Sequence, residues 1–304
     1  MTLDITNGKK TTELDALLYA SKDDILIIRT GTGVKKITKA NLLRECSPDY
    51  MNEGRNLTVV FADEISNYSN AWEWIQARLD AHDLDDLRAG DYIQITLTTN
   101  EVVEMQIAGI NTYVGIFSGA VKPMIDWISR DCLATTHNWN ATNVNNGDAN
   151  EAQPFMASAL YAWLESDVYP TLPTEVKNVI KGKRLYMPIR YTSGSSLTDD
   201  ASWADKTFPH LWVPFEGEIF DHASWSTKGF GTACCVVYEL FRNSWKARMK
   251  KQGRGGSYCP WWSASAYSGN STSAVPVHTN GMSNGNFASA VNGVPVCFRT
   301  MAAS

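Results

Sequence analysis

The segment from Trp261 to Phe298 contains no Asp, Glu, Lys or Arg, although charged residues make up 19% of the 304-residue chain. It is rich in Ser, Asn, Gly and Thr, yet it begins with two tryptophans and ends with the apolar residues Val294, Val296 and Phe298. A disordered segment lacks the aromatic and β-branched residues that bury a core. The apolar ends therefore predict an ordered segment whose polar residues are held on a rigid frame.

The paired tryptophans have two alternative roles, as core anchors or as stacking platforms for a ligand. Neighbouring residues of a strand point to opposite faces, so at most one of Trp261 and Trp262 would be free to stack. We therefore expect both to serve as core anchors.

The polar residues after the tryptophans have the composition of an adaptable binding surface. Tyr supplies contact area with little loss of conformational entropy, and Ser and Asn supply adaptable hydrogen bonds. The lack of charge also avoids the cost of desolvating ions. The alternative is an ordinary polar loop. The residues expected to face outward and to contact a ligand are Ser263, Ser265, Tyr267, Asn270, Thr272, His278, Asn280, Met282, Asn284, Asn286, Phe287 and Asn292.

The composition of the whole chain restricts its class. Hydrophobic residues make up 44%, enough to bury a sizeable core. The net charge of −5 argues against nucleic-acid binding, which requires a basic stripe. The first ten residues lack the apolar region of a signal peptide, and no run of 18 apolar residues predicts a membrane span. We expect synthesis in a cytoplasm and no membrane insertion.

No motif predicts catalysis, a metal site or a cofactor. The six cysteines form no C-x-x-C pair, and we expect them to be free thiols. No histidine lies in an H-E-x-x-H motif, and neither a G-x-S-x-G elbow nor a P-loop is present. The acidic stretch 83–87 lacks the Gly and Glu of a calcium loop, so a solvated helix end is the expected interpretation.

Residues 1–47 form a separate unit in the sequence pattern. Residues 23–30 and 34–38 predict two strands joined by a glycine turn, and residues 39–46 predict a short helix with Thr38 as its N-cap. A hairpin with one helix is too small to be stable alone. We therefore expect it to need a partner surface, most simply copies of itself.

This unit resembles the N-terminal attachment modules of phage tail and fibre proteins. The resemblance implies that it attaches or trimerises the protein on a virion, through contacts with other virion proteins. Because fibres of this class are usually three-fold, we expect a homotrimer. The residues that match the pattern are Leu14, Ala20, Asp24, Leu26, Ile28, Lys35, Lys36, Ile37, Thr38 and Leu42.

Residues 48–304 alternate between short strands and helices. A strand is expected over 57–62, and a capping box of Asn70 and Glu73 predicts a helix over 70–84. A turn at 99–100 separates two strands between 90 and 110, and helices are expected over 156–170 and 172–180. Short strands are expected over 184–189, 210–220 and 234–241.

From about Gly90 onward, the order of motifs resembles phage and gut-bacterial proteins with a C-type-lectin-like domain of the DUF6273 kind. The resemblance implies an α+β lectin-like fold whose last strand returns beside the first. One departure is that Ser263-Ala264-Ser265 stands where many relatives have Leu-Arg-Ser. The motifs that carry the resemblance are GDYIQI from Gly90, THNWNATNVNNG from Thr136, the helical region 158–180, LWVPFEGEIFD from Leu211, WWSASAY from Trp261 and NGVPVCFR from Asn292.

The lectin-like fold has several possible functions. The calcium-dependent sugar motifs of true C-type lectins do not occur in this sequence, so metal-mediated sugar binding is not expected. Formylglycine-generating enzymes share the fold, and GRGGSY (253–258) weakly resembles their R-G-G-S-W signature. We expect no enzyme, because the cysteine pair of those enzymes is not evident.

The resemblances together predict a bacteriophage receptor-binding or fibre-tip protein that adheres to a protein or glycan on the host surface. It would be made in the bacterial cytoplasm and reside in a tail or head fibre of the virion. A capsid decoration protein with an adhesive domain is the alternative. Some lectin-like proteins of this type are diversified by retroelements that rewrite adenines, and the Asn, Ser, Tyr and Thr content of 261–298 fits such rewriting.

Overall fold

The computed structural model divides the chain into two compact units, Met1–Ser47 and Pro48–Ser304. Only the backbone is described for 25–30, 33–38, 186–193 and 196–206, and the helix expected over 39–46 lies outside the described residues. The structure describes residues 25–30, 33–38, 54–115, 122–145, 154–193, 196–226 and 236–303.

The first unit contains the expected hairpin. Strand β1 (Ile25–Thr30) pairs antiparallel with β2 (Gly33–Thr38), and Thr30 is the register partner of Gly33. Two residues therefore connect the strands, a loop length for which glycine is favoured because it adopts positive φ angles without strain.

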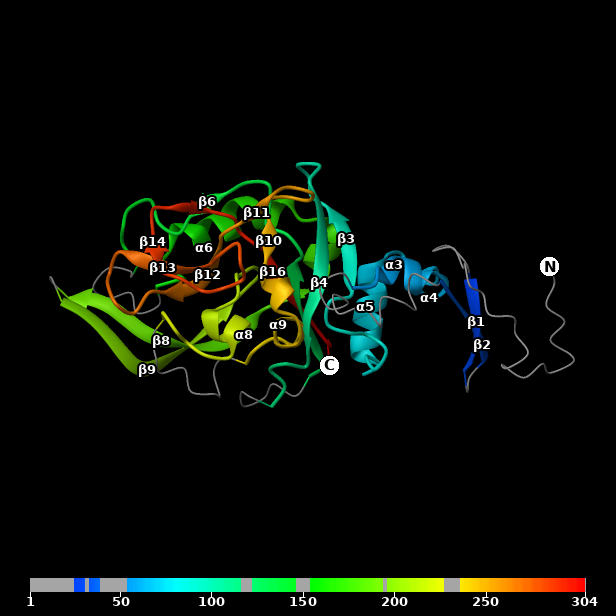
Figure 1. Ribbon diagram of the computed structural model, residues 1–304. Coiled ribbons are helices and arrows are strands. Elements are labelled where there is room, and N and C mark those ends of the chain that lie inside the picture. The colour runs from blue at the N-terminus through cyan, green and yellow to red at the C-terminus, as the bar shows by residue number, and fades with distance from the viewer. Residues whose placement is uncertain are drawn as a thin grey trace, which may run out of the picture. The chain divides into compact units, whose positions relative to one another are not determined.

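The second unit is built around an antiparallel sheet of five strands (Figure 1). Every residue of β5 is buried, and so are the first four residues of β16, as expected for central strands covered on both faces. In order across the sheet, the strands are β3 (Tyr92–Thr96), β4 (Val102–Ile110), β5 (Met124–Ser129), β16 (Cys297–Met301) and β7 (Ile180–Lys181).

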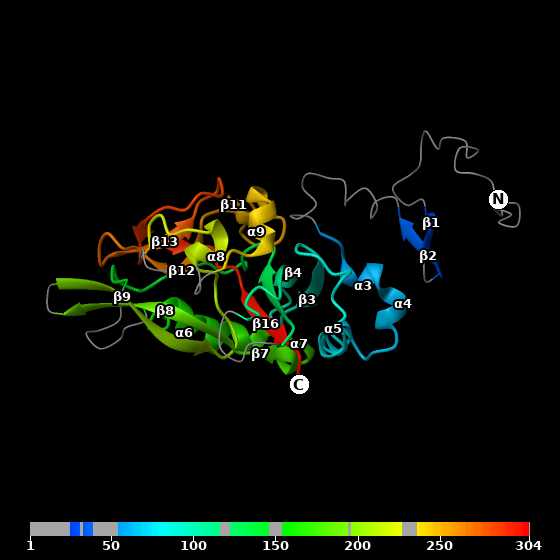
Figure 2. The same cartoon turned by 90° about the horizontal axis from the view of Figure 1, so that it is seen from below.

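The position of the last strand differs from the expectation. Strand β16 pairs with β5 and β7, so it does not lie beside β3, the first strand of this sheet. Figure 2 shows β16 next to β7. The register joins Asp126 to Arg299, whose buried side chains form an ion pair with Nε–Oδ1 and Nη2–Oδ2 distances of 2.7 and 2.8 Å. This bidentate pair satisfies both charges where no water reaches them.

One helix packs against this sheet through a pair of tryptophans. Helix α5 (Ala71–Asp80) begins at Asn70, whose side chain accepts hydrogen bonds from the N–H groups of Trp72 and Glu73, as the capping motif predicts. Trp72 packs edge-on against Trp127 of β5, with ring centroids 5.0 Å apart. The cap thus sets the start of the helix, and the tryptophan pair docks it on the sheet.

Residues 57–65 form two short helices, α3 (Leu57–Val60) and α4 (Ala62–Ile65), so the strand expected over 57–62 is wrong. The side chain of Asn56 caps the first helix by accepting a hydrogen bond from the N–H of Thr58. Leu57 and Phe61 are both buried. Their separation of four residues is one helical turn, and this spacing outweighs the β-propensity of the intervening valines.

The helical region after 156 is confirmed, with three changes of helix type. Helix α6 (Ala159–Trp163) continues into a π-helical turn (Leu164–Val168) and a 3₁₀ turn (Tyr169–Thr171). Pro170 lies in the last of these turns, and α7 (Thr174–Val179) follows after a break. Two expected strands are instead partly helical, with α8 (Glu216–Phe220) inside 210–220 and α9 (Glu239–Asn243) at the end of 234–241.

Helix α8 follows from local capping that strand propensity does not reveal. The carboxylate of Glu218 accepts a hydrogen bond from the N–H of Phe215 at 2.9 Å and so starts α8. Asp221 adopts a φ of 65° and ends it. Residues 234 and 235 lie outside the described residues.

The remaining strands form small antiparallel sheets next to the helices. The strands β12, β13 and β14 pair in that order, β6 pairs with β15, β8 with β9, and β10 with β11. Their bounds are β6 (His137–Asn138), β8 (Lys183–Ser193), β9 (Ser196–Phe208), β10 (Lys250–Lys251), β11 (Tyr258–Cys259), β12 (Trp261–Ala266), β13 (Ser273–Val277), β14 (Asn286–Phe287) and β15 (Val291–Asn292).

Three further findings bear on the expectations. Of the cysteines that the structure describes, Cys132, Cys259 and Cys297 are free, as expected; the other three lie outside it. Within the described residues, no helix has the length and apolarity to cross a membrane. Over the same residues, no group of three or more His, Cys, Asp or Glu side chains is placed to hold a metal ion.

Candidate binding face

The candidate face is carried by β12, β13 and β14 and the turns that connect them. Both tryptophans at the start of β12 are fully buried, which confirms that they anchor the core. Trp261 Nε1 donates to the carbonyl of Arg248 at 2.8 Å, and Trp262 Nε1 donates to that of His137 at 2.9 Å. These bonds satisfy the indole N–H groups, which would otherwise be costly to bury.

Three of the twelve residues expected to face outward are buried instead, namely Ser263, Ser265 and Asn292. All six residues of β12 are buried, so alternation along this strand does not expose one side. Ser263 Oγ donates to the carbonyl of Val275 at 2.5 Å, and Ser265 Oγ accepts from the N–H of Glu216 at 2.9 Å. Their hydroxyls bond to the main chain of the protein and are not available to a ligand.

Tyr267, which follows β12, forms the centre of one part of the face. Its half-buried ring lies 5.7 Å from the ring of Trp225, centroid to centroid. A Cβ atom on Gly269 would lie 2.6 Å from the Tyr267 ring, and one on Gly285 would lie 3.5 Å from it. Two glycines therefore leave room for this aromatic pair at the surface.

A buried carboxylate positions Trp225 beside Tyr267. Glu216 is inaccessible to solvent and accepts hydrogen bonds from the N–H of Trp225 and from both the N–H and the hydroxyl of Ser226, at 2.6–3.2 Å. In addition, the N–H and the hydroxyl of Ser268 donate to the carbonyl of Trp225 at 2.8 and 3.0 Å. The indole itself remains 37% exposed, so this frame presents an aromatic side chain to solvent.

The turn after Tyr267 is held from behind by Asn145. The amide of Asn145 donates to the main-chain carbonyls of Tyr267, Asn270 and Ser273. The side chain of Asn270 accepts from the N–H and the hydroxyl of Thr272 at 2.9 and 3.0 Å, an Asx turn. Asn270 and Thr272 are thus half-buried parts of the turn as well as surface residues.

Strand β14 adds an apolar residue to the same part. Asn286 and Phe287 pair with Ala274 and Ser273 of β13, one residue beyond Gly285. Phe287 is 58% exposed, and the side chains of Asn284 and Asn286 are half-buried. We name the group of Trp225, Tyr267, Asn284, Asn286 and Phe287 the aromatic patch.

The turn over 278–282 forms the second part of the face. The N–H of His278 donates to the carbonyl of Met282 at 2.7 Å, and the side chain of Asn280 accepts from the N–H of Met282 at 3.1 Å. Gly281 has a φ of 77°, and its hypothetical Cβ would lie 3.3 Å from the carbonyl oxygen of Trp245. The turn therefore presents Met282, which is 61% exposed, close to the exposed Trp245.

Sequence reasoning missed Trp225 and Trp245. Both residues precede the uncharged segment 261–298, and the charged or polar residues beside them form no pattern that predicts a binding site. The contacts of Trp225 with Glu216, Ser268 and Tyr267 place Trp225 at the face, and the approach of Gly281 to the carbonyl of Trp245 places Trp245 next to it. Local sequence patterns do not reveal such long-range contacts, so neither tryptophan could be predicted.

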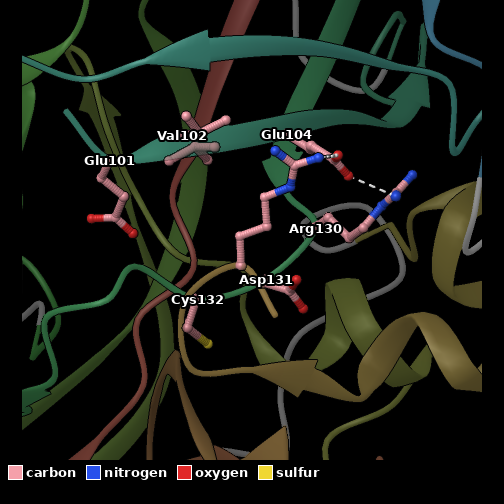
Figure 3. A pocket seen from close by; sticks show the side chains of 8 residues that line it. Glu101, Val102, Glu104, Arg130, Asp131 and Cys132 are labelled. Carbon is pink, nitrogen blue, oxygen red and sulfur yellow. Dashed lines mark ion pairs between the residues drawn. The ribbon is translucent and has the colours of Figure 1, made fainter. Parts of the chain in front are cut away.

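Three further hollows lie on the described part of the second unit. One has a volume of about 540 Å³ and is lined by residues that include Asn100 and Trp163. Another, of about 230 Å³, lies beside α4 and α5. The third, of about 10 Å³, lies beside the ion pairs of Glu104 with Arg130 (2.6 Å) and Arg254 (3.4 Å) and is too small for more than a water molecule (Figure 3). None of the twelve expected residues lines any of these three hollows.

Taken together, the second unit is an α+β domain of short antiparallel strands that presents neutral turns and aromatic side chains at one surface. The chain belongs to the DUF6273 family, a domain of unknown function, whose model matches residues 127–300. This match begins in β5, whereas the expected resemblance began at Gly90 in front of β3. No curated protein and no solved structure matches the chain.

Proposed function

We propose that the chain is a receptor-binding or fibre-tip subunit of a bacteriophage, and that its second unit, with a C-type-lectin-like fold, adheres to a protein or glycan on the host surface. The observation that carries this proposal is the aromatic patch. It combines exposed aromatic rings with neutral amide side chains on a frame bonded to the main chain. Such a combination is typical of recognition surfaces.

The physical basis is the low energetic cost of covering this surface. No charged side chain belongs to 261–298, so a receptor that covers the patch removes no ion of this segment from water. The rings of Trp225 and Tyr267 are already held beside each other, so little conformational entropy is lost on binding. Phe287 then supplies apolar area at the rim.

In this proposal the first unit attaches the protein to other virion proteins and forms a homotrimer. The protein is made in the bacterial cytoplasm and resides in a tail or head fibre. The alternative position, as a decoration of the capsid, uses the same patch for weaker adhesion. Immunogold labelling of phage particles distinguishes the two positions.

Binding of the labelled full-length protein to a panel of bacterial strains and purified surface glycans tests the proposal. We expect Trp225→Ala and Phe287→Ala each to weaken binding to a recognised strain by about tenfold or more, as loss of an aromatic hot spot does. Tyr68→Ala is the matched control, because Tyr68 is an exposed aromatic residue outside the face. Equal binding of all three variants and the parent would contradict the proposal.

A further inference from the structure

Four short segments close into a ring at the base of the candidate face. Segment 132–133 donates main-chain hydrogen bonds to segment 250–252 at 2.9 Å and to segment 293–294 at 3.0 Å. Segment 259–260 pairs with the same two segments, through β10–β11 and through a 2.9 Å bond from the N–H of Gly293. Cys132 and Cys259 therefore lie on opposite members of one ring.

The two sulfur atoms meet over the main chain of Gly293. A Cβ atom on Gly293 would lie 2.7 Å from Cys132 Sγ and 2.8 Å from Cys259 Sγ. Both sulfurs thus lie next to the same point, which only a glycine leaves free. Neither is in a disulfide in this structure.

The geometry points to Cys132 and Cys259 as a dithiol that closes to a disulfide when the protein meets a small-molecule disulfide such as oxidised glutathione. The sulfurs are already neighbours, and both sit on strands that the ring of main-chain bonds holds in place, so closure requires adjustment of the side chains within that ring. This inference rests on the thiol geometry and is independent of the proposed function.

The two thiols differ in a way that fixes the order of events. Cys132 is buried, whereas Cys259 is partly accessible. Burial raises the pKa of the Cys132 thiol, and the neighbouring Cys132 side chain lowers the pKa of the Cys259 thiol. Cys259 is therefore the thiol that a reagent reaches and the one that more readily forms the attacking thiolate.

The exchange is balanced in two steps. The Cys259 thiolate attacks one sulfur of the reagent, a mixed disulfide forms, and one glutathione thiolate leaves and takes up a proton. The Cys132 thiol then loses its proton and attacks Cys259 Sγ, which expels the second glutathione. The protein is oxidised by two electrons, and one glutathione disulfide is reduced to two thiols.

The cross-link would join the segment that follows β5 to the segment that precedes β12. Figure 3 shows Cys132 directly after Asp131 in the wall of the hollow of about 10 Å³. Cys259 lies two residues before Trp261, the first residue of β12. A disulfide here therefore ties the first residues of the candidate face to the central sheet.

Peptide mapping of the full-length protein after incubation with oxidised glutathione tests the inference. The reduced protein is exposed to the reagent without oxygen, and its remaining thiols are alkylated in denaturant. We expect a peptide pair that links Cys132 to Cys259. Trypsin leaves Cys259 and Cys297 on one peptide, since no Lys or Arg lies between them, so fragmentation of that peptide or a Cys297→Ser variant assigns the link.

The matched variant for the two-step order is Cys132→Ser. We expect it to retain a glutathione adduct on Cys259, whereas the parent protein releases that adduct. A rise of several degrees in the melting temperature of the oxidised parent, reversed by a reductant, is the second expected result, because the cross-link constrains the unfolded chain. Alkylation of both thiols in the treated parent, or a stable adduct on its Cys259 without closure, overturns the inference.

Discussion

Trp127 of β5 and Phe298 of β16 are register partners at the centre of the five-stranded sheet, and their rings stack with centroids 6.3 Å apart. These residues lie at the start and near the end of the segment that matches the family model. The two ends of that segment therefore meet in neighbouring strands of one sheet. The uncharged segment 261–298 ends at Phe298, which is a residue of β16 and so joins the segment to this sheet.

The aromatic anchors are expected to carry stability. Phe298→Ala and Trp262→Ala each remove a fully buried ring and should lower the free energy of unfolding by about 3–5 kcal/mol. Urea denaturation followed by circular dichroism measures this change. Tyr258→Ala serves as the control, since Tyr258 is exposed and should change stability by about 0.5 kcal/mol or less.

The exposed turn at Met282 is expected to carry binding and not stability. Met282→Ala removes an exposed side chain and should change the free energy of unfolding by about 0.5 kcal/mol or less. The same variant should weaken adsorption to a recognised strain, if the second part of the face contacts the receptor. Val291→Ala, at an exposed residue of β15, is the control. Unchanged adsorption of the Met282 variant would restrict the binding face to the aromatic patch.

Glu216 is expected to be essential for the position of Trp225. Glu216→Ala leaves the buried N–H and hydroxyl of Ser226 and the part-buried N–H of Trp225 without their acceptor, which should lower stability by about 1–3 kcal/mol. Tryptophan fluorescence quenching by acrylamide should increase as Trp225 becomes more mobile. Glu239→Ala removes an exposed carboxylate and should change neither quantity; the same effect from both variants would refute a specific role for Glu216.

Gly293 is expected to tolerate no larger residue while both thiols are present. Gly293→Ala places a methyl group within 2.8 Å of two sulfur atoms and should cost about 1–3 kcal/mol through overpacking. Replacing Cys132 by Ala in the same chain should recover part of this loss. Thermal melts of the two single variants and the double variant measure the coupling, and strict additivity would show that the sulfurs are not responsible.

The homotrimer is expected to depend on the first unit. The hairpin β1–β2 is too small to be stable without a partner surface. Light scattering of the full chain should give the mass of three copies, and a deletion of residues 1–47 should reduce it. A stable monomer of the full chain at micromolar concentration would contradict this expectation.

Local signals predicted the parts of the fold in which neighbouring residues determine the structure. The capping motif at Asn70 and the turn near Asn100 are such cases, and α5 and the β3–β4 hairpin follow from them. The helix at 57–60 was not predicted, because the apolar run 57–61 fits a strand equally well. The burial of Leu57 together with Phe61 decides between them, and it depends on tertiary packing.

The candidate site was predicted only in part, for a related reason. Exposure along β12 cannot be derived from alternation, because other segments cover both of its faces. Ser263 and Ser265 resemble surface residues by type, and they are buried because main-chain partners from β13 and α8 satisfy their hydroxyls. Trp225 joins the face through contacts with Glu216 and Ser268, which no local pattern encodes.

The way in which Asn145 holds the turn after β12 bears on how this protein can evolve. All three of its acceptors are main-chain carbonyls, which every amino acid provides. A side-chain substitution at Tyr267 or Ser273 therefore leaves the carbonyl that Asn145 contacts in place, and the anchor gains mutational robustness. If this turn contacts a receptor as proposed, a lineage can replace those side chains while it inherits the same backbone anchor.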